Sequence, residues 1–402
     1  MTARPLLRQP AFLRLWVAGG LAGALLWLEI LAAGLFTLDL TGSAFAVAIV
    51  SAARSLPLLG FGAVVGVLAD RHDRRAIVLG GLLLTAAASG SVAALAFAGL
   101  LRPWELCVAA LANGFVYATE LPARRRLIAE VAPHALLGRA IAIDSLTSFG
   151  ARCAGPLIGG VLYGGIGVAG TFAASAAASL IGAALIAGLP RPHVTEPGET
   201  GQTGSVVAGL IEGARFAVRH PRLRTMLGVT MAMNLFGYAY SGLVAPMGRA
   251  AFTLSDPQIG VLAATEPGGA LAAGLVFAWR PPTGRPVAWL AGGVALFMTA
   301  LLAVGLSPSK WFVSLALFVA GFGSASFTNH QSTIAIAAAP GPLRSRVLGL
   351  VTACIGLWPI GLVIAGGLTQ LLSAQRTIAM LALVGLTALA ASLWIGRARA
   401  GD

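Results

Sequence analysis

Long apolar segments alternate with short polar connections from one end of the chain to the other. A helix needs about 20 mostly apolar residues to cross the hydrocarbon core of a bilayer. By that measure the sequence predicts twelve transmembrane helices, at residues 11–38, 44–68, 76–99, 103–123, 140–164, 168–189, 223–246, 257–279, 286–306, 310–330, 346–371 and 376–396. The apolar residues run continuously and do not alternate with a period of two, which argues against a transmembrane β-barrel. The pattern therefore predicts an all-α integral membrane protein.

Composition and charge agree with this fold class. Charged residues make up 10% of the chain, against about 25% in soluble domains. The net charge of +13 does not indicate nucleic-acid binding, because the basic residues lie in short clusters between apolar segments. Most of these clusters are on the side that holds both termini, and Arg102, Arg249, Lys310 and Arg376 are on the other. This asymmetry predicts cytoplasmic termini in a cytoplasmic (inner) membrane.

One long polar connection, residues 190–222, divides the chain into two sets of six predicted helices. Its first part is rich in Pro, Gly and Thr, which is typical of a flexible linker. Its second part, SVVAGLIEGARFAVRHP, predicts a short amphipathic helix at the membrane surface. We therefore expect an N-terminal bundle at 1–189, a linker at 190–222 and a C-terminal bundle at 223–402.

The two predicted bundles also share sequence features at a constant offset of 207 residues. Ala132-Pro133 aligns with Ala339-Pro340, Arg139 with Arg346, and Gly159-Gly160 with Gly366-Gly367. These matches indicate an internal duplication and two pseudo-symmetric six-helix bundles. Such repeats are typical of secondary transporters, in which the substrate site lies near the middle of the membrane between the repeats.

Two motifs then resemble those of the major facilitator superfamily. The stretch GVLADRHDRR resembles the superfamily signature between helices two and three, with matches at Gly66, Asp70, Arg71, Arg74 and Arg75 and with Asp73 in place of a glycine. A stretch of predicted helix five resembles the antiporter motif of exporters, through Gly150, Gly155, Pro156, Gly159 and Gly160. The resemblance implies a rocking-bundle transporter, in which the first motif acts as a conformational gate and the second seals the cavity.

Shorter stretches resemble the branch that contains enterobactin exporters and macrolide efflux proteins. They are Leu40–Ser43, Pro122–Arg125, Glu212-Gly213, Arg219–Pro221 and Arg344–Val347. In the gate that the resemblance implies, we expect Glu120 to be the carboxylate partner of Arg71 or Arg74. Predicted helix four lacks the buried arginine of proton-linked drug exporters, so any proton coupling must use other residues.

Four charged residues lie inside predicted helices: Glu29, Arg54, Arg152 and Glu266. A charge at the centre of a membrane helix costs about 2.5–3.5 kcal/mol, so such residues are usually paired or functional. Glu29 and Arg54 lie at similar depths, which allows an ion pair. We take all four residues as candidates for proton coupling, with Glu29 or Glu266 as the proton carrier. The alternative is a permanent ion pair that only holds helices together.

Several other polar and aromatic residues are candidates to line the substrate cavity, because ligand sites are mostly apolar with a few polar anchors. They are Trp27, Asn113, Asn234, Phe236, Tyr238, Tyr240, Asn329, Gln331 and Trp358. His330, at a helix end, is expected to be solvated. Neither a metal nor a cofactor is expected, since the three cysteines have no ligand spacing. The sequence shows neither a nucleophile–base pair nor a nucleotide-binding loop, so an enzyme is not expected.

The sequence thus favours export of a small amphipathic molecule, such as a drug, siderophore or metabolite, by proton antiport. The expected partners are this small molecule, protons and the lipid bilayer, with no nucleic acid, and the protein is expected to be monomeric. Two alternatives remain open: proton-coupled uptake of a small metabolite, and a membrane sensor or scaffold that does not transport.

Overall fold

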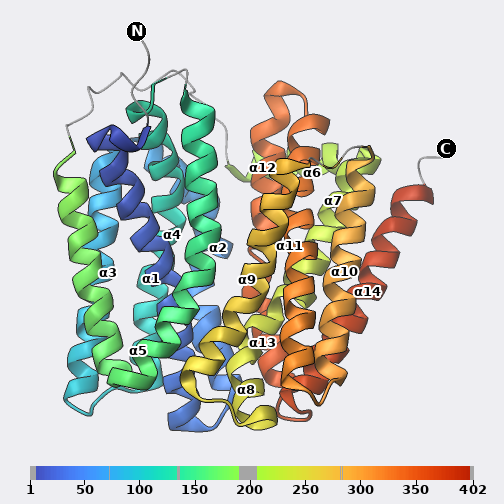
Figure 1. The fold of residues 1–402 in the computed structure, drawn as a ribbon. Helices are drawn as coiled ribbons and strands as arrows, with labels where there is room; N and C mark the ends of the chain where they lie inside the picture. Colours follow the sequence, from blue (N-terminus) through green and yellow to red (C-terminus); the bar gives the residue numbers. More distant parts are fainter. Residues whose placement is uncertain are drawn as a thin grey trace.

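A computed structural model describes residues 6–71, 73–133, 136–189, 206–280, 282 and 284–398 of the chain. Within the described residues the structure is helical, and the helices form two bundles that lie side by side (Figure 1). The blue-to-green bundle is the N-terminal half and the yellow-to-red bundle is the C-terminal half. The start of α1 and the end of α14 lie at the same end of the molecule, which we call the termini side (Figure 1).

The N-terminal bundle begins with a 3₁₀ turn, η1 (Leu6–Arg8), and has five helices: α1 (Pro10–Thr41), α2 (Ala44–Arg71), α3 (Arg74–Phe97), α4 (Pro103–Val131) and α5 (Leu137–Ala187). The last of these contains two membrane crossings. Gly167 joins them with a positive φ of 66°, which glycine adopts without strain. Spans five and six are therefore connected by a single residue with non-helical angles.

Local sequence explains where several of these helices begin. Proline occupies the first turn of α1 and α4, where its missing N–H is not needed. Asp73 is the N-cap of α3, because its Oδ1 accepts a hydrogen bond from the backbone N–H of Arg75 at 2.9 Å. This cap is the physical reason that an aspartate can replace the glycine of the superfamily signature.

The C-terminal bundle contains two crossings that are broken into shorter helices. One consists of α7 (Pro221–Ala232), a π-helical turn η3 (Met233–Gly237), a 3₁₀ segment η4 (Tyr238–Leu243) and α8 (Val244–Phe252). The other consists of α12 (Gly341–Ile355) and α13 (Trp358–Leu368). The continuous helices are α9 (Asp256–Trp279), α10 (Pro286–Leu306), α11 (Lys310–Ala338) and α14 (Ala374–Ala398).

The twelve predicted crossings are accounted for. In the described residues, nine helical segments are each long and apolar enough to cross a membrane. One of them, Arg346–Leu368, runs through α12 and α13, and another, α5, crosses twice. Together α2 and the broken segment from α7 to α8 supply the remaining two crossings. The prediction of an all-α membrane protein with twelve helices in two bundles is therefore confirmed.

The connection between the bundles is described only in its second part. There α6 (Val206–Arg219) forms where the sequence predicts a short amphipathic helix. It packs on α12, where Glu212 pairs with Arg346. The rest of the predicted linker, residues 190–205, lies outside the described residues.

The halves touch along two seams, α5 against α9 and α2 against α13. Both seams are tight at the end of the molecule away from the termini. At the first, a Cβ on Gly160 would lie 2.6 Å from the backbone oxygen of Asp256. At the second, a Cβ on Gly366 would lie 2.4 Å from the Cβ of Ala48. Only glycine lets the backbones approach so closely.

Candidate functional site: a charged cavity between the bundles

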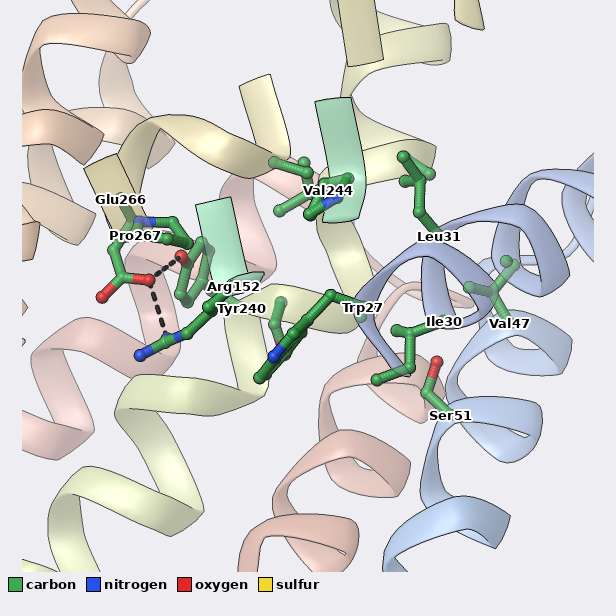
Figure 2. A pocket seen from close by; sticks show the side chains of 16 residues that line it. Trp27, Ile30, Leu31, Val47, Ser51, Arg152, Tyr240, Val244, Glu266 and Pro267 are labelled. Carbon is green, nitrogen blue, oxygen red and sulfur yellow. Dashed lines mark hydrogen bonds and ion pairs between the residues drawn. The ribbon is translucent and has the colours of Figure 1, made fainter. Parts of the chain in front are cut away.

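A cavity lies between the two halves at about the middle of the membrane crossings. Trp27 and Arg152 come from the N-terminal half, and Tyr240, Glu266 and Pro267 come from the C-terminal half (Figure 2). Its volume is about 70 Å³, well below the roughly 300–1,000 Å³ of typical small-molecule sites. In this conformation the cavity has room for a few water molecules, and a larger ligand requires the halves to separate.

An ion pair crosses this cavity from one half to the other. Arg152 of α5 lies 2.8 Å from Glu266 Oε2 of α9, and the Tyr240 hydroxyl donates to the same oxygen at 3.4 Å (Figure 2). The other oxygen, Glu266 Oε1, is buried, and no donor among the described residues reaches it. A buried carboxylate oxygen without a donor is costly. Arg152 Nε is likewise buried without an acceptor among the described residues, so both partners of this pair keep an unsatisfied polar atom.

Two aromatic rings hold the Arg152 guanidinium in place. Its central carbon lies 5.3 Å from the ring centroid of Trp27, on the N-terminal half, and 5.7 Å from that of Tyr238, on the C-terminal half. Both distances are within the range of a cation–π interaction. Arg152 therefore contacts both halves, through its ion pair with Glu266 and through the cation–π contacts of its guanidinium with Trp27 and Tyr238.

Glu29 has a different environment, inside the N-terminal half. Its Oε1 accepts hydrogen bonds from Ser89 at 2.5 Å and Ser175 at 2.6 Å. Its Oε2 accepts from Asn113 at 2.9 Å and Arg54 at 3.2 Å. The ion pair that the sequence allows between Glu29 and Arg54 is present. Four donors from α2, α3, α4 and the second crossing of α5 thus satisfy the charged form of one carboxylate.

The remaining cavity candidates are spread over several places. Trp27 and Tyr240 line the cavity between the halves, and Tyr238 borders it through Arg152. Trp358 donates its indole N–H to the backbone oxygen of Tyr238 at 3.1 Å. The others lie elsewhere: Asn113 in the Glu29 cluster, Asn234 and Gln331 bonded to Thr230, Phe236 packed near Gly385, and Asn329 in a groove between α9, α10 and α11.

The glycines of the antiporter-like motif face two different neighbours. Gly155 and Gly159 pack on the backbone of α1, and Gly160 packs on Asp256 and Gly260 of α9 in the other half. Gly150 faces open space. The dihedral angles stay helical at Pro156, and Gly167 is the non-helical residue inside α5. The motif therefore fits α5 between α1 and α9 by removing side chains, without breaking the helix.

The arginines of the first motif have partners that sequence reasoning did not anticipate. Arg74 pairs with Glu130 near the end of α4, and not with Glu120. Arg75 donates to the backbone oxygen of Ile186 at 3.1 Å. Glu120 instead lies 2.9 Å from Arg124, its neighbour one turn along α4. Gly66, Asp70 and Arg71 fall in a stretch where the structure describes the helix but not the side chains.

Arg124 also pairs with Asp144, a buried acid that the sequence-based list of interior charges omits. Asp144 lies within predicted helix five and carries the same signal as the four charges that were selected. Ser89 and Ser175 had no comparable signal, because serine is common in close-packed membrane helices.

A second ion-pair network was also missed, at the end away from the termini. Arg249, near the end of α8, lies 3.3 Å from Asp39 of α1 and also pairs with Asp256 at the start of α9. Tyr163 donates to Asp39 at 2.8 Å. This network connects the two halves at the same end as the Gly160 and Gly366 contacts.

Twelve helices in two bundles, with charged residues meeting in a cavity between them, define a secondary transporter of the major facilitator fold. The family described as transmembrane secretion effector matches residues 2–399. The chain belongs to this family, which confirms the resemblance stated from the sequence.

Three curated relatives are similar at low identity. The multidrug efflux pump Tap of Mycolicibacterium fortuitum is 27% identical over 90% of this chain and 90% of its own length. The uncharacterized MFS-type transporter YfiS of Bacillus subtilis is 27% identical over 52% of this chain and only 49% of its own length. Macrolide efflux protein A of Streptococcus pyogenes is 28% identical over 31% of this chain and 30% of its own length.

Solved structures share the fold. A bacterial homolog of the human lysosomal transporter Spinster, in an inward-facing and occupied conformation, superimposes with a TM-score of 0.75 at 14% identity, covering 98% of both chains. The nucleoside transporter NupG superimposes with a TM-score of 0.70 at 15% identity, covering 96% of this chain and 99% of its own. At these identities the likeness concerns the fold alone.

Proposed function

We propose that this protein exports a small amphipathic molecule in exchange for protons, by alternating access of the cavity between its bundles. Two named relatives, Tap and macrolide efflux protein A, are efflux proteins, which supports export over uptake. We place the protein in the cytoplasmic membrane with its termini in the cytoplasm, on the basis of the basic clusters on the termini side. We expect it to act as a monomer, because one chain supplies both halves of the cavity.

The observation that carries this proposal is the Arg152–Glu266 pair. It links the halves at the depth where transporters bind substrate. While Glu266 is charged it attracts Arg152 and draws α9 toward α5. A proton on Glu266 removes this attraction, so that Arg152 becomes available to a substrate and the halves can move apart. Proton binding and closure of the cavity are then coupled through one carboxylate.

Glu266 suits the role of proton carrier better than Glu29. Its Oε1 is buried without a donor and it borders a cavity that water can enter. Glu29, in contrast, receives four hydrogen bonds that all favour the charged form. We therefore assign Glu29 and Arg54 to holding the N-terminal bundle together, and Glu266 and Arg152 to coupling.

Glu266→Gln is expected to separate transport from the proton gradient. The cargo is first identified by metabolite profiling of culture supernatant with and without the protein. Its movement is then measured in vesicles with an imposed pH gradient, where the variant should lose the gradient-driven component by about tenfold or more, a change of about 1.4 kcal/mol in the barrier. The control is Glu212→Gln, at an exposed carboxylate of α6. Wild-type coupling in Glu266→Gln would refute the assignment.

The gate at the end of α2 is proposed from the motif, and Asp70 tests it. Asp70→Asn keeps the shape of the side chain and removes its charge, so we expect several-fold slower transport with normal membrane insertion. Asp73→Asn is the matched control three residues away, since asparagine caps a helix about as well as aspartate. Equal transport rates in both variants would place the gate elsewhere.

A further inference from the structure

A groove outside the transport cavity runs along the C-terminal half between α9, α10 and α11. It consists of two adjoining hollows of about 580 Å³ and 590 Å³ that share Phe277 and Trp289. The exposed face of α10 forms one wall, because Arg285, Trp289 and Leu296 recur at helical spacing and are all exposed. Since α10 packs on other helices of the C-terminal half, its exposed face is turned toward the bilayer.

The chemistry of the groove changes along its length. Arg285 lines it at the termini side, where the second hollow adds Asn329, His330 and Thr333. Farther along α10 the lining is apolar, with Gly292, Leu296 and Phe322. From Arg285 to Leu296 the helix rises about 16 Å, close to half of the roughly 30 Å hydrocarbon core. The groove is polar at the membrane surface and apolar through the depth of one leaflet.

In the part of the chain that the structure describes, no carboxylate lines the groove beside the positive charge at its polar end. Residues 267–401 contain no aspartate or glutamate. Among the described residues, neither Arg280 nor Arg285 contacts a carboxylate. The arginines after the corresponding connection of the N-terminal half, between α2 and α3, do have partners: Arg74 pairs with Glu130, and Arg75 donates to backbone oxygens of α5.

His330 is part of the same wall and is not solvated as the sequence suggested. It is buried, its ring stacks on Trp289 at 5.9 Å between centroids, and its Nδ1 donates to the Ser326 backbone oxygen at 2.8 Å. The Ser326 hydroxyl in turn donates to the backbone oxygen of Trp289 at 2.8 Å. The His330 ring holds the Trp289 side chain and the Ser326 hydroxyl holds the Trp289 backbone, so this wall of the groove is preformed.

We propose that this groove binds one phospholipid with an anionic headgroup from the leaflet on the termini side. The headgroup phosphate lies at Arg285, with Arg280 close by in the connection between α9 and α10, and one acyl chain lies along Trp289, Gly292 and Leu296. Basic pockets between membrane helices are a known means of holding anionic lipids. This site does not depend on the cargo or on the direction of transport.

Native mass spectrometry of the purified protein, released from micelles with equal phosphatidylglycerol and phosphatidylcholine, tests the proposal. The wild-type protein should retain phosphatidylglycerol in preference to phosphatidylcholine. Arg285→Gln should lower that retention about fivefold, because each basic residue contributes about fivefold to the binding of anionic lipid. The double variant Arg280→Gln with Arg285→Gln should lower it about 25-fold. Arg222→Gln, an exposed arginine at the start of α7 on the same side, is the charge control and should behave as wild type.

Gly292→Leu tests the apolar end. A Cβ at Gly292 meets no atom within 4 Å, so a leucine fits the protein but fills the groove, and retention of both lipids should fall. Gly80→Leu is the matched control, because Gly80 is the first residue of a similar glycine pair in α3, Gly80-Gly81, and also faces open space. The proposal would be overturned if the wild type retained the two lipids equally, or if both leucine variants lost lipid to the same extent. It would also be overturned if glycerol phosphate alone displaced the lipid, or if the groove proved to be a dimer contact that Gly292→Leu abolishes.

Discussion

Gly160→Leu is expected to prevent closure of the end away from the termini and so to block the transport cycle. A Cβ at this position would lie 2.6 Å from the Asp256 backbone oxygen and 2.9 Å from the Gly260 Cα. Backbone atoms of a helix cannot move aside as a flexible side chain can, so α5 and α9 must separate. Overpacking of this kind costs about 1–3 kcal/mol, which reduces the closed population by about 5- to 150-fold.

The readout is the accessibility of the cavity from each side of the membrane. Ser51 lines the cavity, so Ser51→Cys, in a background without the three native cysteines, reports access by an impermeant maleimide. With Gly160→Leu we expect labelling from the side away from the termini to increase and transport to fall. Gly165→Leu is the control, since a Cβ there meets no atom within 4 Å. Unchanged labelling and transport in Gly160→Leu would show that this contact does not seal the cavity.

The second large effect is expected from Glu29→Leu, on stability. Hydrogen bonds inside membrane proteins contribute on average only about 0.6 kcal/mol each. The larger loss comes from Arg54, which would remain buried without its partner, at a cost of about 3–5 kcal/mol. We therefore expect the free energy of unfolding in detergent to fall by about that amount.

The double variant Glu29→Leu with Arg54→Leu separates the two causes. Removing both charges leaves no unpaired ion, so the double variant should be more stable than Glu29→Leu alone. The measurement is a denaturation curve followed by circular dichroism in the same detergent for all variants. A double variant less stable than the single one would show that the hydrogen-bonded cluster, and not the ion pair, determines the stability of the bundle.

The sequence was sufficient for the fold and for the charged residues of the site. Span length and the clustering of basic residues are properties of the chain itself, because the bilayer fixes the length of a crossing helix. Glu29, Arg54, Arg152 and Glu266 stand out for a related reason, since each carries a charge inside an apolar segment. The similar depths of Glu29 and Arg54 in their predicted helices were also enough to predict that an ion pair between them is possible.

The sequence was less informative about which residues of neighbouring helices contact each other. Arg74 contacts Glu130 rather than Glu120. The two carboxylates are about 15 Å apart along α4, so the axial position of α4 relative to α3 decides which one Arg74 meets. Asn113 belongs to the Glu29 cluster rather than to the cavity between the halves, because the rotation of α4 about its axis turns this side chain toward α1. Hydrophobic periodicity gives little information on rotation when helices are apolar on all sides.

The broken helices of the C-terminal half make its backbone less regular than that of the N-terminal half. The turns η3 and η4 interrupt one crossing beside the cavity, and residues 356 and 357 interrupt another. The Trp358 indole donates to the Tyr238 carbonyl, so the two interruptions support each other. A 3₁₀ stretch in the middle of a helix often marks a hinge, whereas in the opposite bundle four hydrogen bonds to Glu29 tie the helices to one another. We therefore expect the C-terminal bundle to adapt its shape to different cargoes, and the N-terminal bundle to keep its shape while the other moves.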